Sequence, residues 1–187
     1  EEYMKKGVEE YQNEDFQSAE KSFKRVLVIE SSLAYARNFL GLVYSEQNRL
    51  DEAIEQFEMV VEENPENPSY LYNLGMAYKN KDEFNKAEKY LKEAYKYDKV
   101  DPGIVLSLAD NYFNQQRIDK VTEVLREAIN IDGSVDFEDF IYFFKMVEMY
   151  IADGKIDQAE EVLEEIEDII PDDKESREYA AWRFGQL

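Results

Sequence analysis

Carboxylates are the side chains of this sequence that could do chemistry, because they are abundant and often adjacent. Asp and Glu make up 43 of the 187 residues, and Glu62-Glu63, Glu160-Glu161 and Glu164-Glu165 are pairs. Paired carboxylates act as general acid and base when a cleft separates their pKa values. The chain has no His, no Cys and no Gly-rich phosphate loop, so the commonest general base, the thiol nucleophile and the usual zinc ligands are missing. We therefore predict exposed carboxylate pairs on helices, no catalytic residue, no cofactor and no enzyme.

A second group of oxygen ligands lies at residues 130–139, where the sequence resembles part of a calcium-binding EF-hand loop. Calcium requires hard oxygen ligands at alternate positions of such a loop. The first position would be Ala128, which has no side-chain oxygen, and the last would be Asp139, which is shorter than the preferred bidentate Glu. We predict a long turn here, in which Asp136 caps the next helix, and no metal site.

The charge of the whole chain restricts its partners. Only 22 residues are Lys or Arg, so the formal net charge is −21. Binding to nucleic acid or to anionic lipid needs clustered cations, and no apolar run reaches the roughly 18 residues of a membrane span. Since 44% of the residues are hydrophobic, we expect a folded acidic protein that binds no nucleic acid and does not insert directly into a membrane. The absence of Cys fits a reducing cytosol without establishing the cellular compartment.

Small residues recur along the chain with a period of 34. The first series is Gly7, Gly41, Gly75 and Ala109. The second series is Ala19, Ala53, Ala87 and Val121, and a tyrosine series is Tyr44, Tyr78 and Tyr112. A fixed period of this length indicates an array of stacked structural repeats.

This period divides the chain into five repeats and a tail. The repeats cover residues 1–33, 34–67, 68–101, 102–135 and 140–173. Residues 136–139 are an insertion, and residues 174–187 are predicted to form a C-terminal helix that a capping box opens. We expect residues 1–187 to form a single solenoid domain.

Each repeat is predicted to form a helical hairpin. Its apolar residues recur at helical spacing in two blocks, which a polar turn such as residues 46–49 separates. Asn67-Pro68 and Asp101-Pro102 place a capping side chain before a proline, as is typical of a helix start, and Pro65 closes the helix before it. The small residues are expected where two helices cross closely, because a larger side chain would hold them apart.

The pattern Leu40-Gly41…Tyr44…Ala53…Phe57…Pro65 returns as Leu74-Gly75…Tyr78…Ala87…Leu91…Ala94, and it resembles the tetratricopeptide repeat (TPR) family. The resemblance implies an all-α fold, a right-handed superhelical solenoid of about five antiparallel helical hairpins. It also implies a concave groove, made by the first helix of each hairpin, that binds peptides or helices of partner proteins. Single positions depart from the family pattern, such as Glu10 in place of an aromatic residue and Lys99 in place of a proline.

The resemblance further implies which residues line the groove. Steps of three and four residues place them on one stripe of each first helix. They are Met4, Val8, Tyr35, Asn38, Leu42, Ser69, Tyr72, Met76, Lys79, Leu106, Asp110, Phe113, Ile141, Phe144 and Glu148. We expect the apolar members to receive apolar side chains of a partner, Asn38 to fix the register of its backbone, and Asp110 and Glu148 to favour a basic partner.

One known binding mode of the family does not fit these residues. TPR domains with a carboxylate clamp hold the acidic C-terminus of a chaperone through Lys, Asn and Arg at set first-helix positions. This chain has Met4, Val8, Phe39, Ser69 and Asn73 at those positions. We therefore predict an adaptor that binds an apolar or basic amphipathic segment of another protein, and no chaperone tail.

The ends of the array suggest an alternative function. In repeat register, the C-terminal helix has Ala180, Ala181 and Phe184 where another first helix would have packing residues, and Trp182 adds apolar surface. Either the chain is a fragment of a longer array, which we favour, or its last helix closes the array and leaves an apolar end that can dimerise. The second case predicts a self-associating structural scaffold, a homo-oligomer that forms through the array ends.

Overall fold

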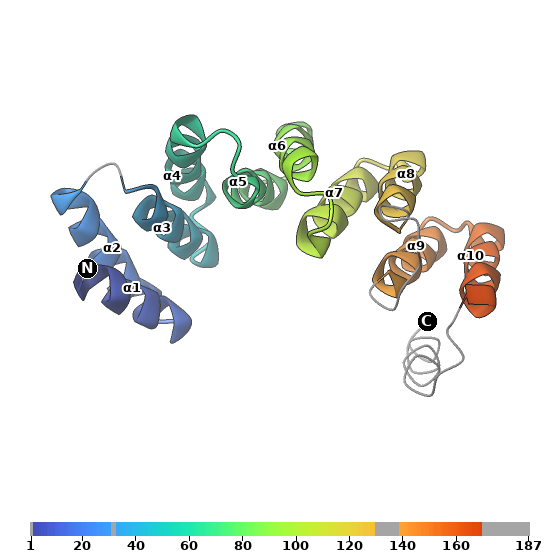
Figure 1. The fold of residues 1–187 in the computed structure, drawn as a ribbon, viewed down its shortest axis with the longest axis horizontal. Helices are drawn as coiled ribbons and strands as arrows, with labels where there is room; N and C mark the ends of the chain where they lie inside the picture. Colours follow the sequence, from blue (N-terminus) through green and yellow to red (C-terminus); the bar gives the residue numbers. More distant parts are fainter. Residues whose placement is uncertain (1, 31–32, 130–138, 170–187) are drawn as a thin grey trace. The chain divides into compact units, whose positions relative to one another are not determined.

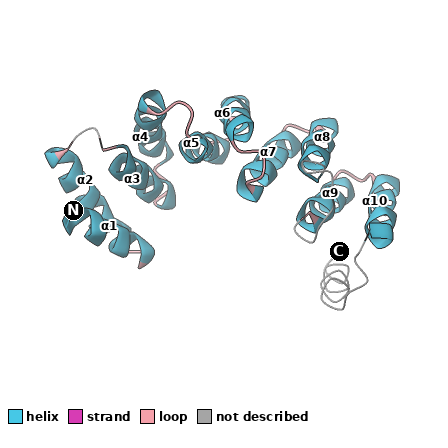
Figure 2. Cartoon of the chain, in the orientation of Figure 1, coloured by secondary structure: helices cyan, strands magenta, loops and turns pink. Residues whose placement is uncertain are grey.

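The described part of the chain consists of ten α-helices. The computed structural model describes residues 2–30, 33–129 and 139–169 (Figure 1). The helices are α1 (Glu2–Gln12), α2 (Phe16–Ile29), α3 (Ala34–Glu46), α4 (Leu50–Glu63), α5 (Pro68–Asn80), α6 (Phe84–Tyr97), α7 (Pro102–Asn114), α8 (Ile118–Ile129), α9 (Phe140–Ala152) and α10 (Ile156–Ile169). No strand occurs in these ranges (Figure 2). The predicted all-α repeat fold is confirmed.

The helices fall into two compact units, which are described separately. Unit 1 is Glu1–Asp98 and contains α1 to α6, and unit 2 is Lys99–Leu187 and contains α7 to α10. Helices that a short turn joins pack against each other, as α1–α2, α3–α4 and α5–α6 in unit 1 and as α7–α8 and α9–α10 in unit 2. The single domain over residues 1–187 stays a prediction.

The first helices begin at the residues where the predicted repeats begin, namely Ala34, Pro68, Pro102 and Phe140. Two of these starts have the predicted caps. The Asn67 side chain accepts a hydrogen bond from the Tyr70 backbone N–H at 3.2 Å, and Asp101 accepts one from the Ile104 N–H at 3.1 Å. A proline follows each cap at the first helical position, where its missing N–H leaves no bond unmade.

The three glycines of the first series lie where the two helices of a hairpin cross closely, as predicted. A Cβ atom added to Gly41 would lie 2.6 Å from Phe57 Cε1, and one added to Gly75 would lie 2.8 Å from Leu91 Cγ. Phe57 and Leu91 are almost completely buried. A large side chain of the second helix therefore rests directly on the backbone of the first helix, with no space for a methyl group.

Each hairpin turn contains one residue in the left-handed region. These residues are Glu14, Asn48, Asp82, Gln116 and Gly154, with φ of 60°, 57°, 59°, 59° and 74°. Each turn also repeats the same hydrogen bonds: in the second hairpin, Asn48 N–H donates to Ser45 O at 2.9 Å and Arg49 N–H donates to Tyr44 O at 2.8 Å. This is the Schellman arrangement, which pairs carbonyls at a helix end. Glycine, the residue that tolerates this φ best, occupies only the fifth turn.

Two predicted features of the C-terminal half lie mainly outside the described residues. The first is the stretch that resembles a calcium-binding loop, of which residues 130–138, including Asp136, are not described. The second is the predicted C-terminal helix over residues 174–187. Within the described part, Ala128 is buried on α8 and no group of three or more Asp or Glu could hold a metal ion. None of the ten described helices is long and apolar enough to cross a membrane.

Replacing Gly75 by Leu is expected to lower the free energy of unfolding by about 2 kcal/mol or more, because the new side chain overlaps Leu91 and the backbone behind it. Urea unfolding followed by circular dichroism measures this change. The control is Asn80→Leu, at the exposed last residue of the same helix, which should stay within about 0.5 kcal/mol of the unsubstituted protein. Equal stability of the two variants would contradict the close crossing.

Replacing Gln116 by Gly is expected to stabilise unit 2 by about 1 kcal/mol, because Gln116 holds a φ of 59° that disfavours L side chains. Thermal unfolding reports the effect as a higher Tm. Asn48→Gly is the matched change in the second turn and should stabilise less, since Asn tolerates this conformation better than Gln. A lower Tm for Gln116→Gly would show that the left-handed turn residue is not strained.

Candidate functional site

The first helices of unit 1 form one face. Helix α3 contacts both α1 and α5, and we call the surface that α1, α3 and α5 share the first-helix face of unit 1. Of its predicted groove residues, Tyr35 is 50% exposed and Ser69 is exposed. The half-buried members are Met4, Val8, Leu42, Tyr72, Met76 and Lys79. Partly exposed apolar side chains at these positions are what a groove for a partner segment requires.

Tyr35 is held in place by a neighbouring ring. Its ring centroid lies 4.8 Å from that of Phe39, and the two rings meet edge to face. Phe39 in turn stacks on Phe23 of α2 at 5.3 Å. A chain of ring contacts therefore connects the exposed Tyr35 to the core of unit 1, which limits the rotamers that Tyr35 can adopt.

Asn38 differs from the prediction that it would fix the register of a partner's backbone. It is only 8% exposed, and its Oδ1 accepts a hydrogen bond from Asn73 Nδ2 at 2.8 Å. The two side chains link α3 to α5, so the carbonyl of Asn38 already has a partner within the protein. Asn73 was predicted only as the occupant of a clamp position, and its spacing of one repeat plus one residue from Asn38 was the signal for this pair.

The first helices of unit 2, α7 and α9, also contact each other, and their shared surface is the first-helix face of unit 2. Leu106, Asp110 and Phe113 are half-buried there, and Ile141 and Glu148 are exposed. Phe144 differs from the prediction, because it is fully buried and offers no surface to a partner. The reason is that α9 is apolar on most sides and buries several of its other side chains as well.

The two acidic side chains that were predicted for the groove in unit 2, Asp110 and Glu148, share one cation. Lys145 Nζ lies 2.9 Å from Asp110 Oδ1 and 4.0 Å from Glu148 Oε2. This contact connects α7 to α9 and offsets part of the negative charge that was expected to favour a basic partner. Lys145 was not predicted from the sequence. Two signals for it were available: it lies three residues before Glu148, and in repeat register it lies beside the predicted groove stripe.

The carboxylate pairs lie mostly on exposed helix positions, as predicted for Glu62-Glu63 and Glu160-Glu161. Glu164 is exposed as well, but Glu165 is half-buried and binds Arg126 of α8. Its two carboxylate oxygens accept hydrogen bonds at 3.0 and 2.9 Å from the two terminal guanidinium nitrogens. This bidentate contact joins the second helices of neighbouring hairpins, which is a structural role.

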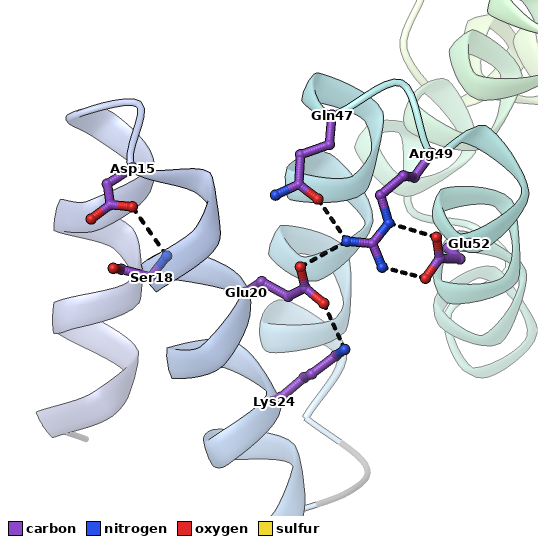
Figure 3. Close-up of polar contacts among 7 residues, drawn as sticks. All are labelled: Asp15, Ser18, Glu20, Lys24, Gln47, Arg49 and Glu52. Atoms are coloured by element: carbon purple, nitrogen blue, oxygen red, sulfur yellow. Dashed lines mark hydrogen bonds and ion pairs between the residues drawn. The ribbon is translucent and has the colours of Figure 1, made fainter.

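A polar junction centred on Arg49 connects the first two hairpins (Figure 3). The guanidinium donates to both oxygens of Glu52, to Glu20 Oε2 at 2.8 Å and to Gln47 Oε1 at 2.7 Å. Lys24 donates to the other oxygen of Glu20 at 2.6 Å. The Arg49 guanidinium also lies over the Tyr44 ring, 4.3 Å from its centroid, as Arg117 lies over Tyr112 at 4.8 Å. The tyrosine series thus provides a platform for cations beside the turns.

The junction changes the acidity of its carboxyl groups. Burial raises the pKa of Glu20, but hydrogen bonds from Lys24 and Arg49 more than offset this effect and leave the pKa below its ordinary value. The hydrogen bond from Arg49 likewise lowers the pKa of Glu52. Ionised carboxylates therefore stabilise the folded state, and this contribution is present above the ordinary value of 4.5 and lost as the pH falls below it.

Replacing Arg49 by Gln is expected to lower the Tm by a few degrees near neutral pH, because the junction loses its central cation. The difference from the unsubstituted protein should shrink at about pH 3, where Glu20 and Glu52 gain protons. Thermal unfolding at both pH values measures it. Arg25→Gln serves as the control, since Arg25 makes no ion pair with a described residue. An Arg49→Gln effect of equal size at both pH values would contradict the role of the carboxylates.

Two family sequence patterns match the centre of the chain. The pattern described as TPR repeat matches residues 41–82, and the pattern described as Tetratricopeptide repeat matches residues 68–101. These ranges contain most of the residues on which the resemblance was based. No curated protein is similar to the chain at a significant level.

Several solved structures have the same fold. MamA superposes with a TM-score of 0.74, and the alignment covers 94% of this chain and 96% of MamA at 22% identity. YrrB, a TPR protein with an unusual peptide-binding site, gives a TM-score of 0.68 over 95% of this chain and 89% of YrrB at 20% identity. A thermophilic TPR protein of Thermus thermophilus, TTC0263, gives 0.63 over 98% and 97% at 19% identity.

Proposed function

We propose that this chain, a member of the tetratricopeptide repeat family and therefore a protein-interaction module, binds an apolar or basic amphipathic segment of a partner protein on its first-helix faces. The observation that carries the proposal is the half-exposed Tyr35, which lies on the same face as the half-buried Leu42, Tyr72 and Met76. A monomeric soluble protein rarely exposes apolar side chains in such a cluster without a partner.

The two kinds of apolar side chain on this face support different parts of the binding. Tyr35, which ring contacts restrain, offers a large rigid surface that loses little conformational entropy on binding. Met76 is unbranched and polarisable, so it adapts to side chains of different shapes. A short helix or an extended segment with apolar anchors at regular spacing fits this combination.

Charge favours a basic segment. The net charge of −21 attracts cations at long range and speeds their encounter with the protein. The first-helix face of unit 2 keeps an exposed carboxylate at Glu148. An acidic chaperone tail is not expected to bind in the groove, because Met4, Val8, Phe39, Ser69 and Asn73 occupy the clamp positions.

The module carries out no reaction in this proposal. The TPR family is a family of non-catalytic repeat scaffolds, and the acidic pairs that could resemble an acid and a base lie on exposed helix positions or bind a neighbouring helix. The alternative, a self-associating scaffold, depends on Trp182 and Phe184, which lie outside the described residues.

A fluorescein-labelled peptide with Leu and Lys at the spacing of an amphipathic helix is expected to bind, and fluorescence anisotropy measures its Kd. Tyr35→Ala and Met76→Ala should each weaken binding about tenfold, since each removes an apolar contact of roughly 1–2 kcal/mol.

The controls distinguish binding at the first-helix face from non-specific apolar binding. Tyr97→Ala removes a tyrosine that is 39% exposed on α6, away from the first-helix face, and should leave the Kd unchanged. A scrambled peptide of equal composition should bind much more weakly. If Tyr97→Ala and Tyr35→Ala weaken binding equally, or if the scrambled peptide binds as well, the first-helix face is not the binding site.

A further inference from the structure

The hairpin α1–α2 carries a pocket that the proposed function does not use. Its volume is about 170 Å³, and residues from both helices line it, among them Lys6 of α1 and Lys21 and Arg25 of α2. None of its lining residues belongs to the predicted groove. The pocket is therefore a second candidate site in unit 1.

The pocket has an excess of positive charge within a strongly acidic protein. Three cations line it against a single carboxylate, that of Glu10. Lys21 and Arg25 lie one helical turn apart and form no ion pair with a described residue. Lys6 Nζ is 3.7 Å from Glu10 Oε1, while the other oxygen of Glu10 accepts a hydrogen bond from Ser22 Oγ at 2.5 Å. Glu10 thus compensates one of the three cations at most.

Arg25 is already positioned to bind a carboxylate. Its guanidinium lies over the ring of Tyr3, 4.8 Å from the ring centroid. A cation–π contact occupies the flat face of a guanidinium and leaves its N–H donors free at the edge. Those donors form the planar fork that binds a carboxylate through two parallel hydrogen bonds.

The other hairpins do not repeat this charge. In repeat register, Lys21 and Arg25 correspond to Glu55 and Met59 in the second hairpin and to Glu123 and Glu127 in the fourth. In the third hairpin, a pocket of about 330 Å³ on α6 is lined by Lys89 and Lys92 together with Glu88 and Glu93. Its charges balance, which makes it a natural comparison for the pocket of α1–α2.

We propose that the α1–α2 pocket binds side-chain carboxylates of a glutamate-rich segment of a partner protein. Arg25 holds one carboxylate through its open edge, and Lys21 and Lys6 provide charge-assisted donors for a second one. The acids elsewhere on the chain oppose this binding, and Asp15 does so directly because it interacts electrostatically with Lys21. Near 0.1 M salt, charges more than about 10 Å away are screened, which weakens this long-range repulsion in the same way as it weakens the long-range attraction for a basic segment.

A labelled hexaglutamate peptide, acetylated and amidated so that only side-chain carboxylates carry charge, tests the proposal by fluorescence anisotropy with the full chain. The unsubstituted protein should bind it, and the Kd should rise between about 50 and about 300 mM NaCl. Lys21→Glu/Arg25→Glu should weaken binding roughly tenfold or more, because the cations are replaced by repelling carboxylates.

The matched control is Lys89→Glu/Lys92→Glu, which changes the net charge by the same amount on α6 and should leave the Kd within about twofold. Tyr35→Ala, which tests the first-helix face, should also leave hexaglutamate binding unchanged. Circular dichroism checks that both charge variants stay folded, and Lys21→Gln/Arg25→Gln replaces the first if it unfolds. No binding to the unsubstituted protein, no loss in the pocket variant, or equal loss in both charge variants would overturn the proposal.

Discussion

The first three hairpins depend on the contact between a large side chain of the second helix and the bare glycine backbone of the first helix. Phe57 on Gly41 and Leu91 on Gly75 bring the helices of a hairpin so close that their separation and crossing are fixed. The contact also orients the outer stripe of the first helix. Leu42 and Met76 directly follow these glycines, so they are turned by about 100° away from the second helix. The core contact thus determines which residues of the first helix turn away from the second helix.

Polar contacts join the hairpins in a different way from the apolar core. Glu20 binds Arg49 across the first two hairpins, and Asp51 binds Lys81 across the next two, at 2.8 and 2.5 Å. Such partly exposed pairs contribute little stability individually. In a chain with 43 acids and 22 bases, however, they place a scarce cation between carboxylates that would otherwise repel each other.

Periodicity predicted the fold well because the same close contact returns every 34 residues in the first three hairpins, where it selects Gly7, Gly41 and Gly75. The helix caps at Asn67 and Asp101, each followed by a proline, could also be predicted from the sequence, since local hydrogen bonds alone define them. The site was harder to predict. Asn38 and Phe144 are buried because neighbouring helices cover them. The spacing of residues along one helix does not predict which of them a neighbouring helix covers. The pocket of α1–α2 was missed because Lys6 joins Lys21 and Arg25 only when the two helices pack, although the spacing of four residues between Lys21 and Arg25 on one helix was an available signal.

Lys145 has a consequence for recognition on unit 2. In the proposed binding, a basic side chain that approaches Asp110 meets a carboxylate that Lys145 already holds at 2.9 Å. It either shares the two oxygens with Lys145, as Lys24 and Arg49 share Glu20, or displaces the lysine. In both cases Asp110 adds less attraction than a carboxylate without an internal cation, so the proposed recognition depends more on how apolar side chains fit Leu106 and Phe113. Because the Asp110–Lys145 pair also connects α7 to α9, a ligand that displaced Lys145 would be thermodynamically linked to the packing of these two helices.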